Sequence, residues 1–379
     1  MKIAYLNTLG IPARYGGFET SVEEVSTRLV KKGHEVTVYC ASNQTVKQSS
    51  YKGVALIHFP LRSNKFVDFP LRSFLSTFDA IGRDFEILHY YGTDSSIFTL
   101  IPKALSRKVV ISLDGLTWNR SSYPPWVRTA LRSSSWLPLY LPDATIVDSL
   151  RVRKWYFNRY GRAPIYISYG AKVSPRNPNV DALQRLGVQE NQYFLFVGRL
   201  VPEKGVHHLL GAFKKLVAGS RFQLVIVGGN PYASTYESSL KRMAKNNVKF
   251  LGYVYGVDME NLFKGAYAYV TASELEGTSP ALLSAMGFGN CVLASDIAEN
   301  LETIGDAGLT FRSGNEEDLR DKMSCLISDP GIVRSFREKA VERVTELYSW
   351  DSIAEQTERL YSRLLDHDSG ELGGRDTDK

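Results

Sequence analysis

The residues of this chain best suited to chemistry lie between Ser273 and Ser295, where a carboxylate, Glu276, precedes a predicted helix. Residues 266–272 form a short apolar run typical of a buried parallel strand. The Thr-Ser-Pro sequence at 278–280 is typical of a helix cap and first turn. A helix N-terminus after a parallel strand offers backbone N–H groups to an anion, and Glu276 can accept hydrogen bonds from hydroxyl groups. This combination favours a sugar phosphate as the ligand.

Two cations lie in a glycine-containing loop after a second apolar run, at 193–197. The loop reads Gly-Arg-Leu-Val-Pro-Glu-Lys-Gly and contains Arg199 and Lys204. Two cations in one loop can neutralise a phosphate or pyrophosphate group without a metal ion. Arg199 can bind two oxygens with its planar guanidinium, and Lys204 acts as a mobile point charge. Both are candidates to bind a pyrophosphate, and an ordinary charged loop without a ligand is the alternative interpretation.

The N-terminal region has the pattern of a β-α-β unit. Residues 2–7 form a predicted strand, a helix capped by Thr20 or Ser21 follows, and residues 34–40 form a second strand. The loop before the helix contains Gly16 and Gly17 but lacks the G-x-G-x-x-G spacing, and no acidic residue ends the second strand. Both features argue against a dinucleotide site. An ordinary turn is the alternative interpretation of the two glycines.

The histidines and cysteines give little support for a metal site. His207 and His208 are adjacent rather than at metal-ligand spacing, so we assign them no ligand role. The three cysteines are far apart, which argues against a disulfide framework or a zinc cluster. Two Asp-x-Asp sequences, at 366–368 and 376–378, lie in a polar tail that is predicted to be disordered. We predict no required metal and no other cofactor. His89 is equally compatible with a structural and a functional role.

Length and composition indicate a globular protein of two domains. The chain has 379 residues, of which 44% are hydrophobic and 23% are charged. Its N-terminus runs directly into a strand pattern without a signal sequence. No apolar run approaches the roughly 18 residues that a membrane-spanning helix needs. We expect a cytoplasmic protein.

Charge is distributed unevenly along the chain. Residues 1–175 contain 23 Lys and Arg against 12 Asp and Glu, whereas the remainder contains 23 against 28. A basic domain suggests an anionic partner: nucleic acid, an acidic membrane surface or a pyrophosphate-linked acceptor. Solvated charge without a partner is the alternative. Segments 121–140 and 151–155 combine tryptophan with arginine and are candidate membrane-contact or acceptor segments. A partly buried helix is the alternative for the first of them.

The 273–295 stretch resembles the donor-site signature of the retaining glycosyltransferases of family 4, E-G-x-x-x-P-x-x-L-E-A-M-x-x-G. The chain is one residue shorter than this pattern between the first glycine and the proline; with that gap the matching positions are Glu276, Gly277, Leu283, Ala285, Met286 and Gly289, with Pro280 close to the usual proline. Ser284 replaces the second glutamate of the signature, which generally binds the nucleotide ribose in this family. A serine can exchange one hydrogen bond but cannot chelate a diol as a carboxylate does.

Other segments extend the resemblance over nearly the whole chain. The run 198–205 is similar to the family's G-R-L-x-x-x-K-G motif, and residues 10–20, GIPARYGGFET, contain its Gly-Gly-x-Glu segment. These residues and the D-G-x-x-W-x-R sequence at 114–120 resemble a rhamnosyltransferase-like subgroup that builds bacterial surface polysaccharides. The alternative for Asp114 is a helix cap or a turn.

The resemblance implies an α/β protein with the GT-B fold, in which two Rossmann-like domains face a central cleft. The expected parts are an N-terminal acceptor domain at 1–172, a linker at 173–190 and a donor domain at 191–349. A helix at 350–365 would return to the N-terminal domain, and a disordered tail would follow at 366–379.

The resemblance also implies a reaction and its participants. The expected enzyme is a retaining hexosyltransferase that moves a hexose or deoxyhexose from a nucleotide sugar to a lipid-linked glycan. The donor dTDP-rhamnose is favoured, UDP- and GDP-hexoses are compatible, and no nucleic acid is expected. The expected location is the inner face of the cell membrane, with peripheral attachment to an anionic surface.

The site residues that the resemblance implies fall into three groups. The catalytic residues are Asp114 and Glu276. Donor binding is assigned to Gly16, Gly17, Arg199, Lys204, Gly277, Thr278, Ser279 and Ser284, and the loop around Tyr253 contacts the base in such enzymes. The acceptor is assigned to Tyr15, Trp118 and Arg120.

Two other functions compete with this interpretation. A nucleotide-sugar 2-epimerase on the same fold would need no lipid acceptor and no basic N-terminal face, and would be expected to carry more acid and base groups. A non-catalytic glycan-binding protein on a degenerate transferase scaffold is suggested by Ser284, and the intact Arg199, Lys204 and Glu276 weigh against it.

Overall fold

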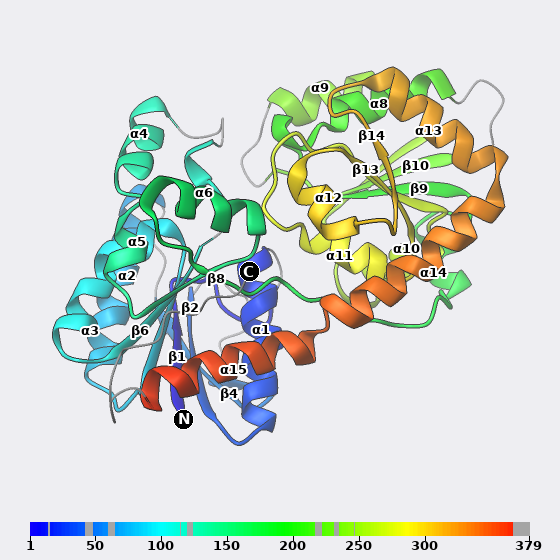
Figure 1. The fold of residues 1–379 in the computed structure, drawn as a ribbon. Coiled ribbons are helices and arrows are strands. Elements are labelled where there is room, and N and C mark those ends of the chain that lie inside the picture. The colour runs from blue at the N-terminus through cyan, green and yellow to red at the C-terminus, as the bar shows by residue number, and fades with distance from the viewer. Residues whose placement is uncertain are drawn as a thin grey trace. The chain divides into compact units, whose positions relative to one another are not determined.

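The chain folds into two compact α/β units (Figure 1). The computed structural model describes residues 1–13, 16–41, 48–59, 65–113, 115–119, 124–216, 222–230, 235–245 and 247–366, without the side chains of 65–69. The first unit holds most of the chain up to Ser168 together with the C-terminal helix from Trp350, and the second holds Tyr169–Ser349. Tyr15, Asp114, Arg120 and the predicted tail from residue 367 lie outside the described residues.

The first unit contains an eight-stranded sheet in the order β3-β4-β2-β1-β5-β6-β7-β8. All neighbouring strands are parallel except the β3–β4 pair. The strands are β1 Lys2–Leu6, β2 Glu35–Ala41, β3 Ser50–Tyr51, β4 Val54–Phe59, β5 Ile87–Tyr91, β6 Lys108–Leu113, β7 Ala144–Val147 and β8 Ile165–Tyr166. The helices are α1 Gly17–Lys31, α2 Lys65–Ile81, α3 Leu100–Ala104, α4 Pro125–Ser133, α5 Leu137–Tyr140, α6 Leu150–Tyr160 and α15 Trp350–Asp366, with 3-10 turns η1 Thr93–Thr99 and η2 Thr117–Asn119.

The second unit contains a six-stranded, fully parallel sheet in the order β11-β10-β9-β12-β13-β14. Its strands are β9 Tyr193–Val197, β10 Gln223–Val227, β11 Val248–Gly252, β12 Ala268–Thr271, β13 Cys291–Ser295 and β14 Leu309–Phe311. Its helices are α7 Val180–Arg185, α8 Val206–Leu216, α9 Thr235–Met243, α10 Gly256–Gly265, α11 Pro280–Gly287, α12 Ala298–Ile304, α13 Glu316–Ser328 and α14 Pro330–Leu347, with the 3-10 turn η3 Pro202–Lys204. Helix α7 lies within the segment expected to be a linker.

The central strands of both sheets are buried on both faces, as is typical of parallel sheets covered by helices. In the second unit, Phe194 and Leu224 lie on one face in a core cluster with Phe213 of α8 and Met323 of α13. Figure 1 shows α8 and α13 on one side of this sheet and α10, α11 and α14 on the other. Such strands are near-continuous apolar runs, which is why the sequence pattern predicts them well.

Helix α15 packs against α1 in the first unit, although it follows the second unit in sequence (Figure 1). Arg28 of α1 donates to Asp351 at 2.6 Å. Glu358 accepts from Lys32 at 2.6 Å and lies 2.7 Å from His34 Nε2. Ion pairs and buried apolar residues of α15 therefore attach the end of the described chain to its beginning.

Candidate functional site

Lys204 and Glu276 form an ion pair at the carboxyl ends of two neighbouring strands of the second unit. Lys204 ends the turn η3 that follows β9, and Glu276 lies in the loop after β12. Ser273 also donates a hydrogen bond to the paired Glu276 oxygen, at 2.8 Å. The side chains of Lys204 and Glu276 are only 15% and 10% exposed. The predicted cation and carboxylate thus share one site in the folded chain.

Backbone contacts hold the two loops together. The Glu274 N–H donates to the Glu203 carbonyl at 2.9 Å. Gly205 has a φ of +63°, and a Cβ there would lie 2.0 Å from the Ala272 carbonyl oxygen. Glycine is required here because any side chain would push the β9 loop away from the β12 loop. This contact fixes the position of Lys204 relative to Glu276.

Arg199 lies in the same loop and is half-buried. Its guanidinium makes no ion pair or hydrogen bond with any described residue, so it is available to an anionic ligand. The backbone around it is fixed, because Leu200 N–H donates to Gly229 at 3.1 Å and Gly198 N–H donates to Val227 at 3.0 Å. A planar fork of donors on a fixed backbone suits a phosphate group.

Helix α11 begins at the predicted place. Ser279 is its N-cap, and the Ser279 hydroxyl accepts a hydrogen bond from Leu282 N–H at 3.4 Å. Thr278 and Ser279 are buried, and Gly277 and Ser284 are half-buried. The hydroxyl of Ser284 makes no hydrogen bond within the described part of the chain. Ser284 thus lies on the helix that follows Glu276, with a polar group that a ligand could use.

Two tyrosine rings lie in the loop that follows β11. Tyr253 and Tyr255 are parallel within 1°, with ring centroids 6.2 Å apart, and are 41% and 51% exposed. A Cβ at Gly229 would lie 3.1 Å from the Tyr253 ring, so the bare glycine lets this ring approach the β10 loop. Exposed aromatic faces of this kind can stack on a nucleobase.

In the first unit, Gly16 and Gly17 form the entrance to α1. Gly16 is the N-cap with a φ of 106°, and the helix starts at Gly17, so the predicted cap at Thr20 or Ser21 is wrong. The reason is Glu19, whose buried carboxylate turns back and accepts from Leu9 N–H at 3.0 Å. A Cβ at Gly16 would lie 2.0 Å from that carboxylate, so this turn requires glycine.

Of the other site residues predicted in the N-terminal half, Trp118 lies in the described part of the chain. Trp118 is 4% exposed and packs against Trp155 of α6, with ring centroids 4.8 Å apart. Its carbonyl accepts a hydrogen bond from Arg128 at 2.9 Å. Trp118 therefore belongs to the core, and an acceptor contact for it stays a prediction, as do the roles of Tyr15, Asp114 and Arg120 outside the described residues.

His89 has a structural environment. It is buried, with Nδ1 2.6 Å from the Tyr361 hydroxyl and Nε2 2.8 Å from the Ser112 hydroxyl. Burial lowers the pKa of His89 to about 3, so the ring stays neutral. Since both nitrogens are occupied by neighbours, the structural interpretation of His89 is favoured.

Comparison with known proteins defines the family. The model of glycosyl transferases group 1 matches residues 183–343, and the model of glycosyltransferase family 4 matches residues 15–170. An uncharacterized glycosyltransferase of Methanocaldococcus jannaschii is 23% identical over 97% of this chain and 99% of its own length. The phosphatidyl-myo-inositol mannosyltransferase of Mycolicibacterium smegmatis is 25% identical over 92% of this chain and 90% of its own length.

The fold is also shared with solved structures. Anabaena HepE in complex with UDP and glucose has a TM-score of 0.79, covering 96% of this chain and 100% of that one at 19% identity. This chain is a GT-B glycosyltransferase of family 4. The predicted fold class is thereby confirmed. Each unit of the transferase contains one of the two sheets, which are the sheets expected for two Rossmann-like domains.

Sequence reasoning missed contacts between distant segments of this glycosyltransferase. The ion pair between Lys204 and Glu276 joins residues 72 positions apart. Likewise, His207 and His208 meet Glu274, which comes from the same loop as Glu276. Two adjacent histidines do not have the spacing of a known metal motif. Glu274 comes close to them only because β9 and β12 are neighbours in the sheet.

Proposed function

We propose that this glycosyltransferase moves a hexose or deoxyhexose, with rhamnose favoured, from a nucleotide sugar to a glycan acceptor with retention of configuration. The observation that carries the donor assignment is the placement of Lys204 and Glu276 at the ends of β9 and β12, with Arg199, which has no partner among the described residues, in the loop of Lys204. Two cations suit the pyrophosphate, and a carboxylate suits the sugar hydroxyls. The UDP and glucose bound to HepE support a nucleotide sugar as donor. The resemblance of residues 10–20 favours dTDP-rhamnose, and UDP- and GDP-hexoses are compatible.

Donor binding would exchange partners within this site. Without donor, Lys204 and Glu276 neutralise each other in a position that is largely removed from water. A pyrophosphate would draw the Lys204 ammonium toward itself together with the Arg199 guanidinium. Glu276 would then be free to accept hydrogen bonds from the sugar. Lys204 would keep an anionic partner and Glu276 would keep hydrogen-bond donors, which limits the cost of desolvation.

We propose further donor contacts for the other residues predicted from the sequence. The backbone of Gly277, Thr278 and Ser279 before α11 would face the donor phosphates or sugar, as would Gly16 and Gly17 from the first unit. Ser284 would lie at the ribose, and Tyr253 would contact the base.

The transfer step would need little from the protein beyond positioning. In a front-face mechanism, the departing phosphate oxygen accepts the proton of the attacking acceptor hydroxyl while the bond from the anomeric carbon to that oxygen breaks. Arg199 and Lys204 would stabilise the charge that develops on the pyrophosphate. Asp114 would orient an acceptor or sugar hydroxyl, with Tyr15, Trp118 and Arg120 toward the acceptor. No metal ion is required in this scheme.

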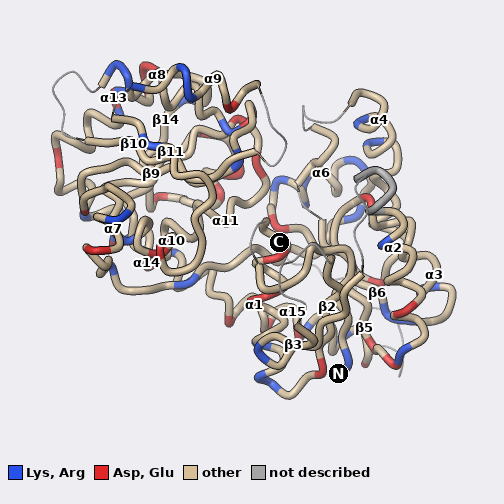
Figure 2. The backbone as a smooth tube through the Cα atoms, turned by 180° about the vertical axis from the view of Figure 1, so that it is seen from behind, with Lys and Arg blue, Asp and Glu red and all other residues tan. Residues whose placement is uncertain are grey.

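The proposed acceptor is a lipid-linked glycan of a surface polysaccharide, handled at the inner face of the cell membrane. Helices α4 and α6 carry Lys and Arg without any Asp or Glu (Figure 2). Trp126 on α4 and Phe157 on α6 are 69% and 56% exposed. Cations beside exposed aromatic rings suit an anionic lipid surface. Among the described helices, none combines the length and the apolar character needed to cross a bilayer.

The decisive experiment is a thermal-shift panel of dTDP, UDP, GDP and ADP with their sugar conjugates, with and without Mg²⁺. A ligand at about 100 times its dissociation constant should add roughly 2.7 kcal/mol to the unfolding free energy. We expect one nucleotide to stabilise the enzyme regardless of Mg²⁺. A flat panel would contradict the donor site and would favour a degenerate scaffold.

Retention and acceptor class need a second measurement. The donor identified by the panel would be incubated with lipid pyrophosphate-linked glycans, and the anomeric configuration of the product would be read by NMR. We expect the donor configuration to be preserved. An inverted product would contradict the front-face mechanism, and isomerisation of the donor without any acceptor would indicate an epimerase.

A further inference from the structure

A second polar cluster lies on the outer side of the loop that carries Glu276. His207 and His208 open the helix α8, and Glu274 lies two residues before Glu276. One ligand-type atom from each of the three residues lies within 4.8 Å of the other two. The His208 Nε2 is 2.8 Å from a Glu274 oxygen, and the two imidazole rings have centroids 3.9 Å apart. These distances require only small side-chain rotations to reach the roughly 3.4 Å separation of ligands around a tetrahedral Zn²⁺.

Each histidine has a polar neighbour on the side of its other nitrogen. The Nδ1 of His207 lies 2.8 Å from the hydroxyl of Tyr236 on α9, which leaves its Nε2 for another ligand. The Nδ1 of His208 lies 3.8 Å from Glu316 on α13. Metal-binding histidines almost always direct their second nitrogen to such a partner, which orients the ring. An isolated ion pair between His208 and Glu274 would require neither arrangement.

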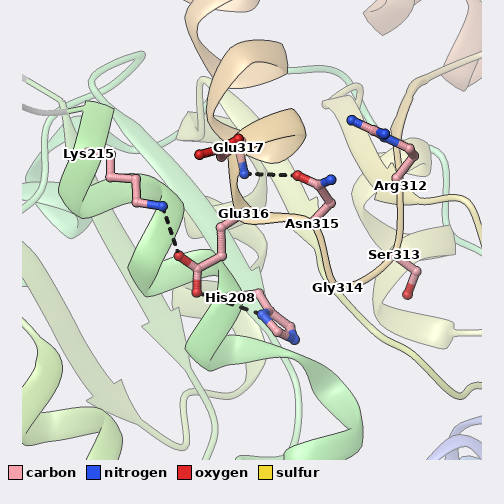
Figure 3. Close-up of a pocket in the computed structure, with 8 residues that line it drawn as sticks. All are labelled: His208, Lys215, Arg312, Ser313, Gly314, Asn315, Glu316 and Glu317. Atoms are coloured by element: carbon pink, nitrogen blue, oxygen red, sulfur yellow. Dashed lines mark hydrogen bonds and ion pairs between the residues drawn. The ribbon is translucent and has the colours of Figure 1, made fainter.

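Glu316 is itself held in place. Its second oxygen lies 3.4 Å from Lys215, so it bridges the lysine and His208 along one side of α8 (Figure 3). A Cβ at Gly211 would lie 2.3 Å from the Glu316 carboxylate, and the bare glycine makes room for it. The carboxylate therefore has a built position beside His208.

Solvent reaches the cluster through a cavity of about 650 Å³ lined by His208, Gly314 and Glu316 among others (Figure 3). A Cβ at Gly314 would lie 3.9 Å from the Glu274 oxygen and 4.0 Å from the His208 Nε2. Gly314 thus borders the two groups on the side open to the cavity. An ion can enter from this side, and water can complete its coordination.

We propose that His207, His208 and Glu274 bind a divalent transition-metal ion such as Zn²⁺, with Tyr236 and Glu316 orienting the two imidazoles. Two imidazoles and a carboxylate are ligands that Zn²⁺, Co²⁺ and Ni²⁺ accept, whereas Mg²⁺ prefers oxygen ligands alone. The ion would replace the direct contact between His208 and Glu274. It would link the start of α8 to the β12 loop and would take no part in the transfer chemistry. This site does not depend on the proposed donor.

Titration of the untagged, chelator-treated full chain with Co²⁺ and Zn²⁺ tests the proposal. Isothermal calorimetry would give stoichiometry and affinity, and the Co²⁺ absorption bands would report nitrogen coordination. We expect one ion per chain at micromolar concentrations and no comparable binding of Mg²⁺. The His207→Ala, His208→Ala and Glu274→Gln variants should each weaken binding by at least about tenfold, and Tyr236→Phe should weaken it less.

Two matched controls alter two of the four other histidines of the chain. His58→Ala alters a histidine of the first unit that lies 2.8 Å from the Gln48 carbonyl, and His367→Ala alters the C-terminal Asp-His-Asp sequence. Neither should change the affinity. Circular dichroism would verify that every variant is folded, and His208→Gln would replace His208→Ala if that variant is not. Binding that appears only at millimolar metal, or that follows the control variants, would overturn the proposal.

Discussion

Arg199 and Lys204 come from one loop but have different surroundings. Lys204 is neutralised by Glu276, whereas Arg199 has no partner among the described residues. Both residues can bind an anion: Arg199 can do so directly, and Lys204 can do so by exchanging Glu276 for the ligand. The loop is therefore suited to a ligand with more than one negative charge. The two residues should therefore respond differently to substitution.

Arg199→Ala should weaken nucleoside diphosphate binding with little change in stability, because the guanidinium makes no ion pair or hydrogen bond with the residues that the structure describes. Charge-assisted hydrogen bonds contribute about 1.5–3 kcal/mol, which corresponds to a loss of roughly tenfold to a hundredfold in affinity. Isothermal calorimetry would measure it. Arg320→Ala, which removes a surface arginine paired with Asp321, is the control. Equal affinities for the two variants would contradict the assignment of Arg199 to pyrophosphate binding.

Lys204→Met and Glu276→Gln should each destabilise the second unit by about 2 kcal/mol, because each leaves a largely buried charge without its partner. The double variant should recover part of that loss, since it removes both charges. Chemical denaturation of the four proteins would give the coupling free energy. A coupling energy of zero would mean that the pair contributes nothing in solution.

Ser284→Glu should tighten nucleoside diphosphate binding by roughly tenfold, because a carboxylate can accept two hydrogen bonds from a ribose diol where a hydroxyl exchanges one. The measurement is calorimetry against the nucleotide identified by the panel, with Ser284→Gln as a neutral control of similar length. Unchanged affinity in both variants would show that position 284 does not face the ribose.

At the scale of elements, the contact between α15 and the first sheet is a buried set of hydrogen bonds. His89 of β5 lies 2.6 Å from the Tyr361 hydroxyl, which in turn donates to the Tyr5 hydroxyl at 3.1 Å. Burial keeps His89 neutral and its pKa near 3. One of the contacts that attach α15 therefore depends on whether His89 carries a proton.

The pH dependence of this contact has a definite sign. Unfolded His89 would bind a proton below about pH 6.5, whereas the folded form binds one only near pH 3. Stability is therefore complete above pH 6.5 and falls by about 1.4 kcal/mol per pH unit below it. Chemical denaturation at several pH values between 7 and 5 should show this slope in the unfolding free energy of the wild type. His89→Gln should show a shallower slope, and parallel slopes would contradict the burial of a neutral ring.

Elements also show what the sequence could predict. The apolar runs predicted β9 and β12, and the Ser279 cap of α11 is as expected, because both depend on neighbouring residues alone. The start of α1 depends instead on the Glu19 carboxylate reaching Leu9, ten residues earlier. The pairing of Lys204 with Glu276 depends on strand order. Local patterns contain neither kind of information.

At the scale of the whole molecule, part of the excess positive charge of the N-terminal half lies on α4 and α6. Neither helix carries an acidic residue, and α4 has no buried residue. The sequence predicted the basic segments at 121–140 and 151–155. Folding adds that Trp126 is exposed and that Trp155 packs on Trp118, so the two tryptophans have different roles.

Binding to vesicles that contain anionic lipid should weaken as salt concentration rises, because ions screen the attraction between Lys or Arg and the surface. Replacing Arg151, Arg153 and Lys154 of α6 with Gln should reduce binding by roughly 1 kcal/mol per residue. Co-sedimentation would measure it. Three matched replacements in the second unit, Lys214, Lys241 and Arg242, should have no effect. Salt-independent binding, or none at low salt, would contradict a peripheral membrane role.

The placement of α15 also has a consequence for biosynthesis. On a ribosome, all of the second unit emerges before the helix that completes the first, since Tyr169–Ser349 precedes Trp350. The second unit can fold as soon as it is made, as domains generally do. Until α15 follows, Tyr5 and His89 lack the partner that Tyr361 supplies. The half of the enzyme that is translated first is thus completed last, and chaperones would meet it while the part of its sheet around Tyr5 and His89 still lacks α15.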